Sequence, residues 1–193
     1  MVLPVTAYGH PVLRKAGAEI DKDYPDLQEF LNNMWETMYF SEGVGLAAPQ
    51  VNKALRVFIV DASPYGHQVP EAADFRMTFI NPKITKRFGD NKLMEEGCLS
   101  IPHIREEVSR PESIKIQYYD AEWNYHDEEF SGMLARIIQH EYDHIEGILF
   151  TDHLSSMRKT MLRTKLSNIS KGKVDVDYKM VFPFMKKAKK TKA

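Results

Sequence analysis

Two histidines and a glutamate share one short segment in the C-terminal half of the chain. In QHEYDHIEG, His140 and His144 are four residues apart and Glu141 lies between them. The surrounding apolar residues recur with helical spacing, and Gly147 is placed to end a helix. Residues i and i+4 lie on one helix face, so both imidazoles can bind one divalent ion beside a carboxylate. A buried histidine pair held by hydrogen bonds is the alternative, and the motif context favours the metal site.

The only cysteine of the chain is a candidate for the third metal ligand. Cys98 follows Gly97 in the segment EEGCLSIP. A lone cysteine is usually a small buried apolar residue, but a site with two histidines needs another protein ligand. One sulfur and two nitrogens in tetrahedral geometry leave a fourth position open for water. A single cysteine also excludes a disulfide within the chain, which is consistent with a reducing compartment.

Three segments together resemble the signature motifs of the peptide deformylases. They are EGVGLAAPQ at 42–50, EEGCLSIP at 95–102 and QHEYDHIEG at 139–147, and they occur in family order. The similarity runs from LPVTAYGHPVLRKAG to a last helix ending near Gly172, so the chain resembles the bacterial type with a C-terminal helix. The resemblance implies a metal-dependent hydrolase that removes the N-terminal formyl group from N-formylmethionyl nascent polypeptides and releases formate.

The resemblance also implies the catalytic and metal-binding roles of individual residues. Cys98, His140 and His144 are expected to bind the metal. Glu141 is expected to be the general acid and base acting on a metal-bound water.

A second set of residues is expected to surround the formyl carbonyl. The resemblance implies that the oxyanion is held by the metal, the Gln50 amide and the Leu99 backbone N–H, with Gly45 giving backbone contacts beside them. A buried glutamine is tolerated only if its hydrogen bonds are made, and an oxyanion position would use one of its donors.

A pocket for the methionine side chain is expected from matching positions of the family. A flexible apolar wall suits this unbranched side chain, although simple core packing is the alternative for each member. Its expected lining is Val44, Met94, Met133, Ile137 and His140. Arg105 matches a position that can approach the peptide backbone. Arg136 occupies a position where relatives often carry an apolar residue, so its role stays open.

The ligand set is compatible with several ions and, by itself, with more than one function. One sulfur and two imidazoles suit Zn²⁺, Fe²⁺, Co²⁺ or Ni²⁺, and the resemblance favours Fe²⁺ in the cell. A zincin-like metallopeptidase usually takes its third ligand downstream of the helix, so the upstream Cys98 argues against it. A noncatalytic metal-binding or ribosome-binding relative is disfavoured by the intact Glu141 and Gln50.

The length and the residue patterns predict a single compact α+β domain. The 193 residues, 43% of them hydrophobic, suffice for one core. We expect short, mostly antiparallel strands around the central helix that carries the HExxH motif, with an N-terminal and a C-terminal helix. Helices are predicted over 26–40, from Gly132 to near Gly147, and from Ser155 or Ser156 to near Gly172. Strands are predicted over 56–62, 77–88 and 105–120, with an extended segment over 173–185 that adds to a sheet edge.

The last residues form a separate electrostatic unit. Residues 186–193 contain five lysines and no acidic residue, so we expect a deformylase domain over 1–185 and a disordered tail. A contact with ribosomal RNA is the functional alternative for this tail. No apolar run is long enough for a membrane span, and the start lacks a secretion signal. The sequence therefore predicts a bacterial cytoplasmic protein without membrane or sequence-specific nucleic-acid partners.

Overall fold

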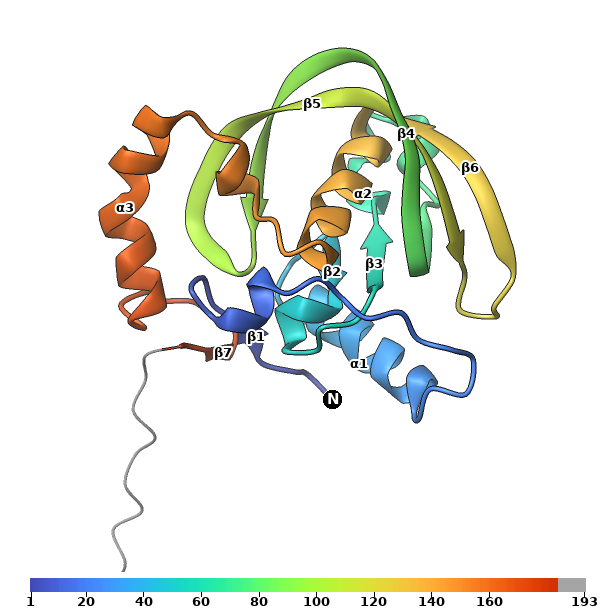
Figure 1. Ribbon diagram of the computed structural model, residues 1–193, viewed down its shortest axis with the longest axis horizontal. Helices are drawn as coiled ribbons and strands as arrows, with labels where there is room; N and C mark the ends of the chain where they lie inside the picture. The colour runs from blue at the N-terminus through green and yellow to red at the C-terminus, as the bar shows by residue number, and fades with distance from the viewer. Residues whose placement is uncertain (184–193) are drawn as a thin grey trace, which may run out of the picture.

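A computed structural model describes residues 1–183 and contains a curved antiparallel sheet around one central helix (Figure 1). The sheet has five strands in the order β2-β3-β4-β5-β6, and a separate parallel pair joins β1 to β7. The strands are β1 Val5–Thr6, β2 Gly45–Ala47, β3 Val57–Asp61, β4 Arg76–Cys98, β5 Ile101–Tyr119, β6 Tyr125–Ser131 and β7 Met180–Val181. The helices are α1 Leu27–Phe40, α2 Gly132–Ile145 and α3 Ser156–Ser170. The predicted α+β class is confirmed.

The long strands curve around α2, which lies in the concave side of the sheet (Figure 1). Every residue of α2 from Leu134 to Ile145 is buried. Its apolar side packs against sheet residues such as Phe58, Phe79 and Ile116. Burying one large apolar side chain contributes about 1.5–3 kcal/mol, so this core fixes the helix firmly. The polar residues of the same helix are consequently held at fixed positions inside the protein.

The β4–β5 hairpin is longer than the sequence patterns predicted. β4 has 23 residues and β5 has 19, so the expectation of short strands is wrong for these two elements. The second half of β4 is mostly polar and exposed, and it therefore lacks the apolar alternation that marks a strand in a sequence. Backbone pairing with β5 keeps it extended, and the ladder ends at the pair Cys98 and Ile101. The hairpin thereby carries Cys98 to α2, where it contacts His144.

The helix predictions are confirmed to within about two residues. Ser155 is the N-cap of α3, because its side chain accepts a hydrogen bond from the Arg158 N–H. The extended segment after α3 is confirmed in part, since Met180 and Val181 pair with β1. The predicted tail over 186–193 lies outside the described residues. Within residues 1–183, no helix is both long and apolar enough to cross a membrane.

Candidate metal centre

The end of β4 and one face of α2 bring the three predicted metal ligands together. The ligand atoms of Cys98, His140 and His144 all lie within 4.8 Å of one another. We call these three residues the metal group. Cys98 Sγ lies 3.3 Å from His144 Nε2. Both histidines project from consecutive turns of α2, as the i, i+4 spacing requires. This set of one sulfur and two nitrogens fits a tetrahedral divalent ion with one open position.

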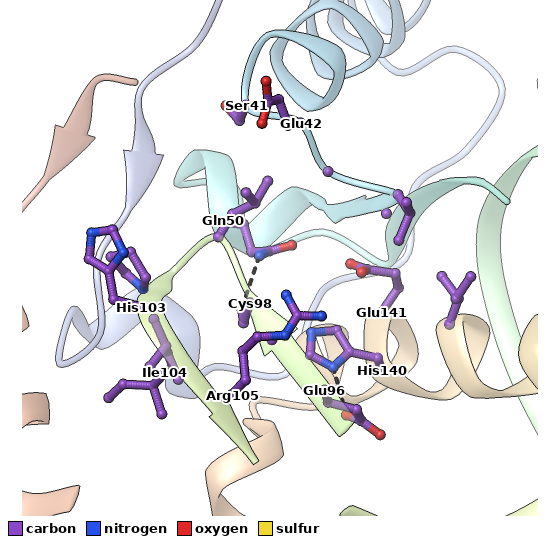
Figure 2. A pocket seen from close by; sticks show the side chains of 18 of the residues that line it. Ser41, Glu42, Gln50, Glu96, Cys98, His103, Ile104, Arg105, His140 and Glu141 are labelled. Atoms are coloured by element: carbon purple, nitrogen blue, oxygen red, sulfur yellow. Dashed lines mark hydrogen bonds and ion pairs between the residues drawn. The ribbon is translucent and has the colours of Figure 1, made fainter. Parts of the chain in front are cut away.

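The orientation of His140 is fixed by a buried carboxylate on β4. His140 Nδ1 donates to Glu96 Oε2 at 2.9 Å, and Figure 2 marks this contact. Its other ring nitrogen therefore remains available for a metal. Such a carboxylate behind a histidine fixes the tautomer of a ligand and strengthens its donation to the ion.

Glu96 is the centre of a buried ion network that the sequence analysis missed. Its two oxygens accept hydrogen bonds from Arg110 at 2.7 and 2.9 Å, and one of them also accepts from Arg136 at 2.9 Å. Burial alone would raise the pKa of Glu96, but the hydrogen bonds from His140 and Arg110 hold it well below its ordinary value. Glu96 is therefore ionised. Residues i and i+2 of a strand point to the same face of a sheet, so the position of Glu96 two residues before Cys98 could have indicated that Glu96 lies near the metal group.

Arg136 now has a structural role. Besides Glu96, its guanidinium donates to the backbone carbonyls of Lys92 and Val108 at 2.6 and 2.8 Å. An apolar residue at this position would remove the hydrogen bonds to both carbonyls and to Glu96 Oε1. Arg136 thus connects α2 to both long strands behind the metal group.

Glu141 places a buried carboxylate beside the metal group. Its side chain projects into the cavity drawn in Figure 2, and the residue is 4% exposed. Its Oε2 atom has no hydrogen-bond partner among the described residues. Burial raises the pKa of Glu141 to about 7. A carboxyl with this pKa can both accept and release a proton near neutral pH.

Gly45 leaves the space that the Glu141 carboxylate occupies. A Cβ atom at this position would lie 2.7 Å from Glu141 Cδ, which is closer than two non-bonded carbon atoms normally approach. Gly45 begins β2, and this strand packs against α2. The glycine is therefore required by the close approach of the carboxylate, whatever backbone contacts it makes to a ligand.

Gln50 points its amide nitrogen at the metal group. The side chain is 1% exposed, and its Oε1 accepts the Ala47 N–H at 2.8 Å. Its Nε2 lies 3.4 Å from both Cys98 Sγ and Ser100 Oγ. The bond to Ala47 settles which end of the amide is the acceptor, so the donor end faces Cys98 (Figure 2).

A cavity of about 680 Å³ opens over the metal group and Glu141. Of the residues predicted for the substrate pocket, five line it: Val44, Arg105, Met133, Ile137 and His140. Gln50 and Leu99, the two residues predicted to supply oxyanion donors, also line it, as does Gly45. Arg105 is exposed and pairs with Glu95 at 2.8 Å.

Met94 is the predicted pocket residue that does not line this cavity. It pairs with Val108 across the β4–β5 ladder, and neither residue reaches the cavity wall. The β4 residues that line the cavity are Glu95–Cys98, so the lining ends one residue short of Met94. The sequence analysis also missed the segment Asp175–Tyr178, which forms part of the wall.

Comparisons with known proteins agree with the fold and the residue pattern. The family model described as Polypeptide deformylase matches residues 2–160. The peptide deformylase of Christiangramia forsetii is 54% identical over 196 aligned positions, which cover 98% of this chain and all of the relative. That of Cytophaga hutchinsonii is 51% identical and covers 96% of this chain and 100% of the relative.

Solved structures give the same result. A peptide deformylase from Legionella pneumophila has a TM-score of 0.77 and 31% identity, covering 90% of this chain and 98% of that one. A class I type b peptide deformylase from Acinetobacter baumannii, solved with Met-Ala-Ser bound, has a TM-score of 0.74 and 36% identity. It covers 80% of this chain and 99% of that one.

Proposed function

The chain belongs to the polypeptide deformylase family, and we propose that its deformylase activity depends on a divalent ion bound by Cys98, His140 and His144. The observation that carries this assignment is the convergence of their ligand atoms beside the Glu141 carboxylate, which is buried and has one oxygen without a partner. The reaction is the hydrolysis of the formamide at the start of an N-formylmethionyl chain, with release of formate.

Glu141 is the proposed general acid and base. A divalent ion supplies Lewis acidity, which lowers the pKa of water and makes it a nucleophile near neutral pH. Glu141 accepts the proton that the attacking water loses, and it then transfers this proton to the departing amine nitrogen. The raised pKa of Glu141, about 7, suits both transfers. Its unpartnered Oε2 leaves an acceptor available for the first of them.

The negative charge that develops on the formyl oxygen needs hydrogen-bond donors next to that oxygen. Gln50 Nε2 is the proposed side-chain donor, since its position is fixed through the bond between Gln50 Oε1 and the Ala47 N–H. The backbone N–H of Leu99 is the proposed second donor. Each such donor commonly lowers the barrier by about 3 to 4 kcal/mol.

The methionine side chain is proposed to occupy the apolar part of the cavity. Val44, Met133 and Ile137 provide this wall next to Glu141. The Acinetobacter baumannii relative was solved with Met-Ala-Ser bound, the peptide that remains after formyl-Met-Ala-Ser is deformylated. Arg105, at the exposed part of the same cavity, is the residue proposed to approach the peptide backbone.

Replacing Gly45 with alanine is expected to reduce kcat by about 100-fold. The added Cβ forces the Glu141 carboxylate to move, and displacement of a catalytic group by about 1 Å can cost this much. Steady-state rates of formate release measure the effect, and bound metal is determined in the same samples. A variant with wild-type kcat and full metal content would show that the carboxylate does not need its present position.

Formate release from formyl-Met-Ala-Ser is the direct test of the proposed reaction. The metal-loaded protein should release formate and leave Met-Ala-Ser intact. A metallopeptidase would instead cleave the peptide. The two products are distinguished by mass, so cleavage without formate would reject the proposal. No observation favours the peptidase alternative, since the ligand group within residues 1–183 contains the upstream Cys98.

Fe²⁺ is the proposed ion in the cell. The ligand set accepts Zn²⁺, Ni²⁺ and Co²⁺ as well, so geometry alone does not select among them. The iron form is expected to lose activity in air, because the Cys98 thiolate beside a redox-active ion is readily oxidised. Activity and the mass of Cys98 peptides are followed during aeration, with the nickel form as control. Stable activity of a verified iron form would contradict this expectation.

The cellular setting is proposed from the substrate and the charge pattern. The protein would encounter nascent chains at the ribosome, in the cytoplasm. In that compartment its single cysteine would stay reduced. The five lysines within 186–193, which follow the proposed domain over 1–185, are proposed to bind phosphates of the ribosomal RNA. Co-sedimentation with ribosomes at low salt tests the contact, and equal binding by a chain ending at Met185 would reject it.

A further inference from the structure

The chain segment after α3 returns to the substrate cavity. We call residues 173–181 the C-terminal strap. Four consecutive strap residues, Asp175–Tyr178, line the same cavity as Cys98 and Glu141. The strap then ends in β7, which pairs with β1 through Val5 and Met180. A segment far from the motifs in sequence is therefore part of the wall of the site.

Several contacts fix the strap in place on both sides of Tyr178. Before it, His103 Nε2 donates to the carbonyl of Asp175 at 2.6 Å. After it, the Val5 N–H donates to the carbonyl of Lys179 at 2.8 Å. Met180 packs on the core cluster that contains Ile101 and Ile104. Tyr178 is thus presented to the cavity by a segment with partners at each end.

The hydroxyl of Tyr178 binds the backbone of Leu99. Tyr178 Oη donates to the Leu99 carbonyl oxygen at 2.8 Å, across 79 residues of sequence. Leu99 lies in the turn of the β4–β5 hairpin, directly after Cys98 and before the buried Ser100. The two peptide groups that meet at the Leu99 Cα carry its N–H and its carbonyl. These two planar groups are joined only by the φ and ψ rotations of Leu99, so a hydrogen bond that holds the carbonyl limits how far the Leu99 Cα, and with it the N–H, can shift.

We propose that Tyr178 is a positioning residue for the deformylation reaction. Its hydroxyl holds the Leu99 carbonyl so that the Leu99 N–H keeps its direction toward the formyl oxygen. Tyr178 itself does not touch the reacting atoms. This inference rests on the proposed function, since it requires the Leu99 N–H to be an oxyanion donor. The C-terminal strap would then contribute to catalysis by positioning Leu99.

The variant Tyr178→Phe tests the proposal, because it removes the hydroxyl and keeps the ring in the cavity wall. We expect kcat for formyl-Met-Ala-Ser to fall by about three- to ten-fold, the rate effect of one hydrogen bond of about 1 kcal/mol. KM and the inhibition constant of Met-Ala-Ser should stay within about two-fold of wild type. This product lacks the formyl oxygen, so it does not report on the oxyanion donor.

Tyr118→Phe is the matched control. It also removes a hydroxyl that donates a hydrogen bond, here to Glu128 at 2.6 Å, and it lies outside the cavity lining. Its kcat should equal that of wild type. An unchanged kcat in Tyr178→Phe, or a fall that is matched by Tyr118→Phe or explained by lost metal, would overturn the proposal. A wild-type protein that releases no formate would overturn the proposed function and this inference together.

Discussion

Replacing Glu141 with glutamine is expected to reduce kcat for formyl-Met-Ala-Ser by about 10²- to 10⁴-fold, the range of a lost general acid–base group. The amide has nearly the same shape, so it fits the space beside Gly45. It cannot accept the proton of the attacking water at neutral pH, and it has none to give to the departing amine. The loss should therefore appear in kcat, whereas KM should change little.

Two controls make the Glu141 result specific. Bound metal must remain at the wild-type level, because Cys98, His140 and His144 are unchanged. Glu129→Gln, on the exposed side of β6, removes a carboxylate of the same type away from the cavity and should leave kcat unaltered. If Glu141→Gln retains more than about a tenth of the wild-type kcat with full metal, another group carries the proton.

Replacing Glu96 with glutamine is expected to reduce the free energy of unfolding by about 3–5 kcal/mol, the usual cost of breaking a buried ion pair by removing one partner. Arg110 and Arg136 would keep their buried charges and lose the carboxylate that they share. His140 would lose the carboxylate that orients its ring. Metal affinity is therefore expected to fall by about 10- to 100-fold in addition.

Glu95→Gln is the matched control for this second prediction. Glu95 is the preceding residue and also pairs with an arginine, Arg105, but its side chain is 61% exposed. Loss of an exposed pair costs about 1 kcal/mol or less. Urea unfolding of both variants, with and without a chelator, separates fold stability from metal binding. Equal destabilisation by the two variants would mean that the buried network does not stabilise the fold.

Local sequence patterns predicted the histidine pair because the relative position of two residues on one helix is local. Helical spacing alone places His140 and His144 on one face, and a single cysteine left few choices for a sulfur ligand. The central helix itself was predictable from its apolar period. Met94 lies outside the cavity lining, because the place of a strand residue depends on its cross-strand pairing, here with Val108, which the sequence does not reveal.

Contacts between distant segments could not be predicted in this way. Glu96 and Arg110 look like solvent-exposed charges of a hairpin, and only the packing of α2 against that hairpin buries them as an ion pair. Tyr178 follows a helix end in a short polar stretch without a strong periodic signal. The parallel pairing of β7 with β1 joins the two ends of the described chain and holds the segment whose Tyr178 binds the Leu99 carbonyl.

Cobalt substitution tests the central claim most directly, namely that Cys98, His140 and His144 bind one ion together. The Co²⁺ protein should show a sulfur-to-metal charge-transfer band together with the intense visible absorption of tetrahedral cobalt. The band should persist in Glu141→Gln and disappear in Cys98→Ser. A cobalt-loaded wild-type protein without that band would contradict the proposed centre.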